Sequence, residues 1–284
     1  FRGGYHDFII RKGGLDIYPR LVAAEHHATF GDSQLESGIP ELDKLLGGGI
    51  QRGTSTLVMG PAGSGKSSIA SQYIIAAAER GDAGLIVAFD EGRNMLLRRC
   101  RAIGQRIDKH IDSGKITVKQ VDPAEMSPGE LSHMIRRAVE NDNVKVVMID
   151  SLNGYTNAMP EERFLTIQLH ELLSYLGQRG VTTIMVVSQA GLIGSSMRSP
   201  GDTSYLADSV ILLRYFELRG AVKKAISVMK KRGGRHEQTI RSLEISDAGI
   251  KIGEPLQRFR GILTGVPEQL DIDPTAGPVG NARG

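Results

Sequence analysis

The sequence predicts an α/β fold in which a mainly parallel sheet is flanked by helices and continued by antiparallel strands toward the C-terminus. Apolar runs at residues 54–59, 84–89, 144–150 and 181–187 alternate with helical patterns. Strands that are apolar along their whole length are typical of parallel sheets with both faces covered. After residue 208, strand patterns follow one another with short turns and no helices between them, which indicates antiparallel pairing.

The composition indicates a globular protein. The chain has 284 residues, of which 40% are hydrophobic and 24% charged, enough for one large domain or two small ones. The single cysteine, Cys100, excludes an internal disulfide and fits the reducing cytoplasm, where we expect the protein to reside. No apolar run is long enough for a membrane span, and a net charge of +3 does not by itself indicate nucleic acid binding. Because the first residue is Phe1, we expect a fragment, a processed form or part of a longer chain.

Two stretches of the chain resemble each other. Residues 2–7 read RGGYHD and residues 232–237 read RGGRHE, and a Gly-apolar-x-Ile pattern follows each copy. A repeat with a period of about one domain predicts tandem domains, although Gly and charged residues could also match by coincidence. We therefore expect the end of an upstream repeat plus a linker at residues 1–34, a main domain at 35–253, and a partly disordered tail at 254–284.

A phosphate-binding loop is the most specific motif. Residues 60–67 read GPAGSGKS, the G-x-x-x-x-G-K-[ST] pattern, between the strand at 54–59 and a helical pattern over residues 68–80. Glycines let backbone N–H groups turn toward phosphate oxygens, Lys66 reaches the β- and γ-phosphates, and Ser67 can bind Mg²⁺. The loop predicts binding of ATP or ADP with Mg²⁺, and its candidate ligands are Gly60, Ala62, Gly63, Ser64, Gly65, Lys66, Ser67 and Ser68.

The remaining patterns complete the expected fold. They predict a short helix from residue 37 to the glycines at 47–49, helices over 93–103 and 127–141, a helix from residue 160, and strands over 115–121, 209–215, 222–229, 238–245 and 250–252. The helix at 127 opens with Ser127-Pro128-Gly129-Glu130, a capping box with Pro at the first helical position.

Polar residues close three of the parallel strands. Ligands of open α/β sheets bind at the carboxyl ends of the strands, so these residues should converge on the nucleotide. We expect Asp150 to organise Mg²⁺, and Asp90 with Glu91 to orient or deprotonate the attacking water, Asp90 being also a candidate metal ligand. Gln189 could sense the γ-phosphate. For each of these, a helix cap or a solvated strand end is the alternative.

A basic run, Lys230-Lys231-Arg232, stands at the end of a predicted strand. Such a run is usually a solvated edge. An arginine finger supplied to a neighbouring subunit would have the same pattern, and the run overlaps the repeated motif.

Together, the phosphate loop, the Asp90-Glu91 pair, the Val-Val-Met-Ile-Asp strand and the Lys-x-Arg-Gly-x-x-His motif resemble the KaiC family, RecA-like ATPases of the circadian clock and their bacterial relatives. The match runs from about Ser37 to Gly265. The resemblance implies a RecA-like P-loop NTPase core, a chain with two such domains of which this is the second, and six-subunit rings with ATP between subunits. It also implies clock or signalling proteins as candidate partners.

The resemblance assigns further residues to the nucleotide. It implies that Ile103 lies near the adenine and that Lys230, Arg232, Gly234, His236 and Asp247 reach the nucleotide of the neighbouring subunit. We count Lys231, in the same run, among the nucleotide-binding candidates. The assigned catalytic residues are Asp90, Glu91, Lys66 and Arg232.

Two positions depart from the family pattern. Asp90 replaces the first of two adjacent glutamates that serve as catalytic base, which weakens that role or moves it to Glu91. Clock KaiC carries a Ser-Thr pair that becomes phosphorylated, and here the pair is Ser204-Tyr205. Ser204 is the candidate acceptor of a serine autokinase, an activity that the sequence leaves open.

Two other functions remain as alternatives. A RecA/RadA-like DNA-dependent ATPase would need the loop at residues 191–202 to track DNA, but that loop offers Arg198 and no aromatic residue for base stacking, so DNA is not an expected partner. The second alternative is a scaffold that binds ATP only in order to assemble.

Overall fold

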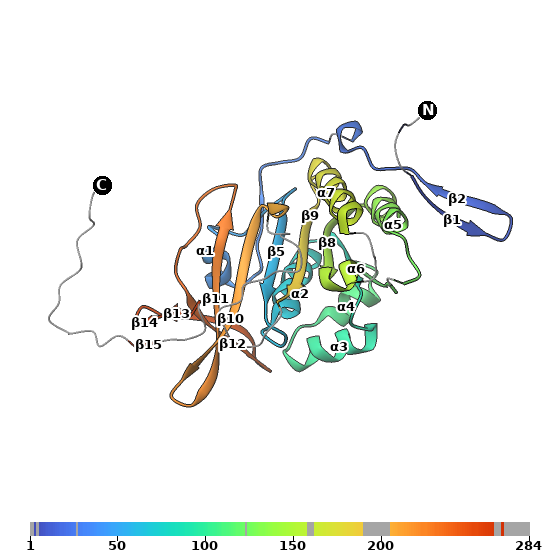
Figure 1. Cartoon of the computed structure of the whole chain (residues 1–284). Helices are drawn as coiled ribbons and strands as arrows, with labels where there is room; N and C mark the ends of the chain where they lie inside the picture. The colour runs from blue at the N-terminus through green and yellow to red at the C-terminus, as the bar shows by residue number, and fades with distance from the viewer. Residues whose placement is uncertain are drawn as a thin grey trace.

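A nine-stranded sheet forms the centre of the fold (Figure 1). The computed structural model describes residues 3, 6–26, 28–122, 124–157, 162–189, 205–263 and 268–269. The strands of the sheet lie in the order β13-β12-β11-β10-β5-β9-β8-β6-β7. The parallel strands are β5 (Ser55–Gly60), β6 (Ala83–Ala88), β7 (Ile116–Gln120), β8 (Val144–Asp150), β9 (Thr182–Ser188) and β10 (Ser209–Leu218). The antiparallel strands are β11 (Ala221–Lys231), β12 (Arg241–Ser246) and β13 (Gly249–Pro255). The predicted fold class is confirmed.

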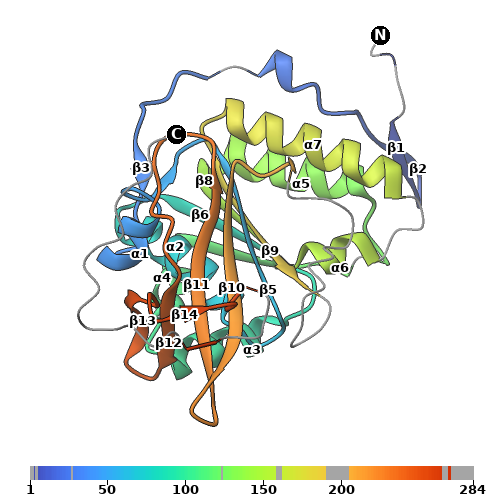
Figure 2. The ribbon, with the colours of Figure 1, turned by 60° about the vertical axis from the view of Figure 1, so that its left-hand side comes forward.

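Helices cover both faces of the parallel strands (Figure 2). On one face the core contains side chains of α1 (Pro40–Leu45), α2 (Lys66–Glu79), α3 (Arg93–Ala102) and α4 (Ile107–Asp112). On the other it contains side chains of α5 (Pro128–Asn141), α6 (Leu152–Asn157) and α7 (Glu162–Gln178). Both faces being buried explains why the central strands β5, β6, β8 and β9 are largely apolar, whereas the edge strand β7 alternates and is mostly exposed.

The short helices α4 and α6 were not expected. Each has six residues, and α6 contains Gly154 and Asn157, which are poor helix formers. They form because their apolar residues pack into the core: Ile107 is fully buried on α4, and Leu152 and Tyr155 are buried on α6. The predicted cap of α5 is present, since Ser127 Oγ accepts a hydrogen bond from the Glu130 N–H at 3.2 Å.

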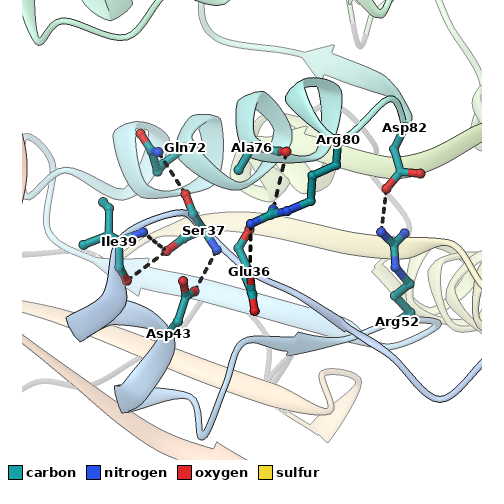
Figure 3. Close-up of polar contacts among 9 residues, drawn as sticks. All are labelled: Glu36, Ser37, Ile39, Asp43, Arg52, Gln72, Ala76, Arg80 and Asp82. Carbon is teal, nitrogen blue, oxygen red and sulfur yellow. Dashed lines mark hydrogen bonds and ion pairs between the residues drawn. The ribbon is translucent and has the colours of Figure 1, made fainter.

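The segment before the phosphate loop is fastened to α2 by polar contacts (Figure 3). The Ser37 N–H donates to Asp43 Oδ1 at 2.7 Å, and Gln72 Nε2 on α2 donates to the Ser37 carbonyl at 2.9 Å. Arg80, directly after α2, pairs with Glu36 at 3.0 Å. These contacts hold α1 and the pair β3 (Gln34–Leu35) and β4 (Ile50–Gln51) against the helix that carries the site.

A separate two-stranded hairpin lies beside α5, on the blue ribbon of Figure 1. It consists of β1 (Asp7–Arg11) and β2 (Gly14–Tyr18). Asp7 Oδ2 accepts the Gly129 N–H at 2.6 Å in the first turn of α5, and Arg11 pairs with Glu130 at 2.9 Å. The strand leads through η1 (Ala23–Glu25) into the main domain.

Packing continues past residue 253. Ile262 is buried with Phe216 and Ala225, and β14 (Phe259–Arg260) pairs with β15 (Glu268–Gln269). Of the tail expected at 254–284, residues 264–267 and 270–284 lie outside the described residues. Within the described part of the chain, every helix is too short or too polar to cross a membrane.

Candidate nucleotide-binding site

The phosphate loop joins the end of β5 to the start of α2. Gly63 and Gly65 have φ of +74° and +107°, left-handed conformations that side chains rarely adopt. A Cβ on Gly63 would lie 2.9 Å from Tyr215 Oη, and one on Gly65 would collide with Ile245. No side chain caps α2, and its first turn has no acidic residue. The first N–H groups of a 14-residue helix therefore remain available to an anion.

Two side chains of the loop are buried with unused hydrogen-bonding capacity. Lys66 Nζ donates to the Pro61 carbonyl at 2.7 Å, and burial lowers the pKa of Lys66 to about 8 although the charge of Asp150 acts in the opposite direction. Ser64 is fully buried, and its Oγ has no hydrogen-bond partner among the described residues. Phosphate oxygens would supply partners for both.

Asp150 closes β8 close to the first turn of α2. Burial raises the pKa of this carboxyl, a hydrogen bond from Ser67 and the charge of Arg99 lower it, and Glu91 and Asp90 raise it. The described residues contain no group of three or more His, Cys, Asp or Glu that could hold a metal by itself. Ser67 and Asp150 fit Mg²⁺, which usually takes one or two carboxylates and completes its coordination with phosphate oxygens and water.

Asp90 and Glu91 follow β6, which pairs with β8 so that Ala88 lies opposite Asp150. Asp90 is exposed and accepts a hydrogen bond from Ser151 Oγ. Glu91 is three-quarters buried and forms an ion pair with Arg99 on α3, with Nη2 2.9 Å from Oε2. The predicted pair of acids therefore separates into two environments.

Gln189 lies beside the phosphate loop. Its N–H donates to the Gly60 carbonyl at 3.0 Å, and its buried Oε1 lacks a partner among the described residues. Asp150, Glu91 and Gln189 all stand at the carboxyl ends of parallel strands, the edge at which the phosphate loop also lies.

Three residues that contribute to the site were not identified by the sequence analysis. Tyr215 on β10 donates from its hydroxyl to the Ala62 carbonyl at 3.2 Å, and Arg99 holds Glu91. Ile245 on β12 lies against Gly65. The parallel pairing of β10 with β5 was the missing information, because it brings Tyr215 beside the loop.

Ile103, which is expected near the adenine, stands next to a glycine that approaches Asp247, a residue assigned to the nucleotide of the neighbouring subunit. A Cβ on Gly104 would lie 2.9 Å from the Asp247 carbonyl oxygen, so the turn between β12 and β13 meets the end of α3, where Ile103 is half-buried. Asp247, which the resemblance assigns to the nucleotide of the neighbouring subunit, therefore lies close to Ile103 of its own chain.

The basic run lies at the other end of the sheet. Lys231 is level with Ser209, which pairs with Thr56 at the start of β5, whereas the phosphate loop follows Gly60 at its end. The separation along the strand is about 13 Å or more. The run and the phosphate loop of one chain are therefore kept apart.

The side chains of the run have different partners. Lys230 Nζ donates to the Ala207 carbonyl at 2.7 Å, and Lys231 Nζ donates to the carbonyls of Leu46 and Gly49, which follow α1. Arg232 is exposed and contacts the Tyr205 carbonyl at 3.1 Å. Of the other candidates, Gly234 is exposed and His236 half-buried; Ser204 and the loop at residues 191–202 lie outside the described residues.

A family model described as the KaiC ATPase matches residues 35–257. This chain belongs to the KaiC ATPase family. A circadian clock protein KaiC3 from Synechocystis is 29% identical over 266 residues, covering 94% of this chain and 52% of the relative. Circadian clock oscillator KaiC proteins of Picosynechococcus and Parathermosynechococcus lividus are 25% and 27% identical, covering 95% of this chain and 52% and 50% of those proteins. The chain spans about half the length of these curated relatives.

Proposed function

We propose that this KaiC-family chain binds ATP with Mg²⁺ and hydrolyses it, at a site that a second copy of the chain completes. The phosphate loop carries the proposal, because its buried Lys66 and Ser64 and the uncapped start of α2 have hydrogen-bonding capacity that the other described residues leave unused and that phosphate oxygens would fill. The family match supports the same activity. The proposed location is the cytoplasm.

Each residue has a role in this proposal. Backbone N–H groups of residues 62–68 bind the phosphates, Lys66 neutralises charge between the β- and γ-phosphates, and Ser67 with Asp150 would hold Mg²⁺. Bound Mg²⁺ would neutralise charge on the phosphates. Glu91 takes a proton from the attacking water, and Gln189 contacts the γ-phosphate.

The first experiment is calorimetric titration of ATP with Mg²⁺. Lys66→Ala should abolish measurable binding because the substitution removes the buried cation. Lys251→Ala, which removes an exposed lysine from β13, is the matched control and should bind as the wild type does. Unchanged affinity in a folded Lys66→Ala protein contradicts the proposal.

The completion by a second copy is supported by the position of the basic run, away from its own phosphate loop. Arg232 is the finger in this arrangement, with Lys230 and His236 beside it. Mixing inactive Arg232→Ala and Lys66→Ala proteins should restore part of the ATPase activity, since some interfaces then have both groups intact. No recovery, with subunit exchange shown by fluorescence transfer, counts against it.

The assembly proposed is a six-subunit ring that signals to partner proteins. The curated relatives are named as circadian clock proteins. The ATP-dependent ring is what the resemblance to the KaiC family implies for this chain. Light scattering with and without ATP and Mg²⁺ tests it: a mass of six chains is expected with nucleotide. A mass that stays that of one chain rejects the ring.

We propose that the N-terminal hairpin is the end of an upstream domain, because β1–β2 and β12–β13 have the same turn length and the same register over the four pairs next to the turn. A serine autokinase activity with Ser204 as acceptor is a separate proposal. Peptide mass spectrometry after incubation with ATP should find phosphate on Ser204. Phosphate on Tyr205 alone, or none while ATP is hydrolysed, removes the autokinase.

A further inference from the structure

The guanidinium of Arg99 holds the carboxylate of Glu91 side-on. Arg99 Nε lies 3.1 Å from Oε1 and 3.2 Å from Oε2, and Nη2 lies 2.9 Å from Oε2. Both side chains are 23% exposed. Two contacting nitrogens in a planar fork fix the direction of the carboxylate as well as its position.

Arg99 is itself supported by α2. Its Nη1 and Nη2 both lie 3.5 Å from Ser71 Oγ, and Ser71 is fully buried. Ser71 lies one turn after Ser67 on the same helix. The contacts therefore connect Glu91 to the helix whose first turn carries Lys66, and the carboxylate is positioned relative to the phosphate loop by a rigid element.

The two oxygens of Glu91 differ in their contacts. Among the described residues, Oε2 accepts from both Nε and Nη2, whereas Oε1 accepts from Nε alone, which it shares with Oε2. A carboxylate has about four lone-pair positions, so Oε1 keeps more of its accepting capacity. Oε1 is the oxygen better able to accept a proton.

We propose that Arg99 is a positioning residue for hydrolysis: it holds Glu91 so that Oε1 faces the attacking water. The inference rests on the proposed ATPase function and deepens it. As the water oxygen bonds to the γ-phosphorus, its proton passes to Oε1. The bond from that phosphorus to the bridging oxygen breaks, and ADP and inorganic phosphate leave.

Three variants test this role in the full chain. Arg99→Asn removes the fork and the charge, Arg99→Lys keeps the charge without the fork, and Arg98→Asn alters an exposed arginine of the same helix. We expect kcat to fall by about 10- to 100-fold in Arg99→Asn, since small misplacements of a catalytic group have effects of that order. Arg99→Lys should recover part of the loss, and Arg98→Asn should match the wild type.

ATP affinity, measured by calorimetry, separates positioning from binding. All three variants should bind ATP with Mg²⁺ as the wild type does, so the effect falls on kcat and not on affinity. An unchanged or raised kcat in Arg99→Asn overturns the inference while leaving the ATPase proposal intact. A wild type that binds but never hydrolyses ATP overturns the proposed function as well.

A double variant tests whether Arg99 acts through Glu91. Glu91→Gln should itself be slow, and adding Arg99→Asn should slow it no further, because the residue to be positioned is already inactive. Multiplied effects in the double variant would show that Arg99 acts elsewhere and overturn the inference. Melting temperatures and circular dichroism of each variant verify that every protein compared is folded.

Discussion

The hairpins β1–β2 and β12–β13 have the same register over the four pairs next to the turn, but their surroundings differ. Arg11 pairs with Gly14 and Ser246 with Gly249, so each hairpin has two residues in its turn. Counting from the turn, Phe8 corresponds to Leu243. The corresponding apolar side chains are exposed in the first hairpin and buried or half-buried in the second: Phe8 is 58% exposed and Leu243 is 3% exposed.

This difference shows that the features that allow a hairpin to form are not the features that make it stable. Alternating apolar residues and a short turn with glycine suffice for the local pairing. Stability depends on the surface that covers the apolar face, and an isolated two-stranded hairpin is marginal at best. β12–β13 has that cover, because β12 joins the large sheet through β11 and Ile245 lies against the phosphate loop.

The largest expected contrast is between Leu243→Ala and Phe8→Ala. Removing the buried side chain should lower the free energy of unfolding by about 2–5 kcal/mol, and removing the exposed one should change it by less than about 0.5 kcal/mol. Urea unfolding followed by circular dichroism measures both. Equal losses would mean that the first hairpin is covered in solution.

The hairpin β12–β13 also contacts the phosphate loop, and the Lys66 side chain of that loop is a buried cation. The pKa of Lys66 falls from 10.5 to about 8 on folding, so between these values the unfolded chain binds more protons than the folded one. Stability of the nucleotide-free protein should therefore rise as pH increases from 8 toward 10.5, by at most about 3 kcal/mol. Thermal unfolding of wild type and Lys66→Met should differ in this slope; the same slope in both would assign it to other groups.

Two glycines with the same backbone conformation allow a comparison. Gly13, in the first turn, and Gly249, the first residue of β13, both have φ of +109°, and a Cβ on either would meet no atom of the described residues within 4 Å. Alanine at each should add strain of about 1–2 kcal/mol. We expect that cost to appear in the global unfolding of Gly249→Ala and only in hydrogen exchange of β1 and β2 for Gly13→Ala. A global loss in both would join the two hairpins into one cooperative unit.

The smallest effect concerns the docking of the first hairpin. Asp7 accepts from the Gly129 N–H at the start of α5, where a negative charge is favourable. Asp7→Asn should weaken docking by about 0.3–1 kcal/mol, seen as faster hydrogen exchange of Gly129. Lys12→Gln, in the exposed turn, should leave that exchange rate unchanged.

The parallel core could be predicted because its signal is local. β8 has the predicted bounds 144–150, because a strand that is buried on both faces is recognisable from its own apolar residues. The helices α4 and α6 could not, because tertiary packing and not propensity forms them. The hairpin β1–β2 did carry a signal, the alternation of Phe8 and Ile10 followed by Gly13 and Gly14, but its residues were assigned as an end and linker.

The candidate site divides in the same way. Its motif residues could be found because each stands next to a strand in the sequence. The pairing of Arg99 with Glu91 could not, because it depends on how the chain turns between β6 and α3. The partners of the basic run could not be predicted either. Lys230 and Lys231 are the same residue type, but they occupy alternate positions of a strand and donate to different carbonyls.

The distance between the basic run and the phosphate loop of one chain has a consequence for stoichiometry. An interface in which each copy gives its basic run and receives another is head-to-tail, with different surfaces on its two sides. An open row of n copies then has n − 1 complete sites, whereas closing the row adds the last one without adding a chain. Activity per subunit would therefore rise with concentration as rows lengthen and reach its maximum at closure, when the number of complete sites equals the number of chains.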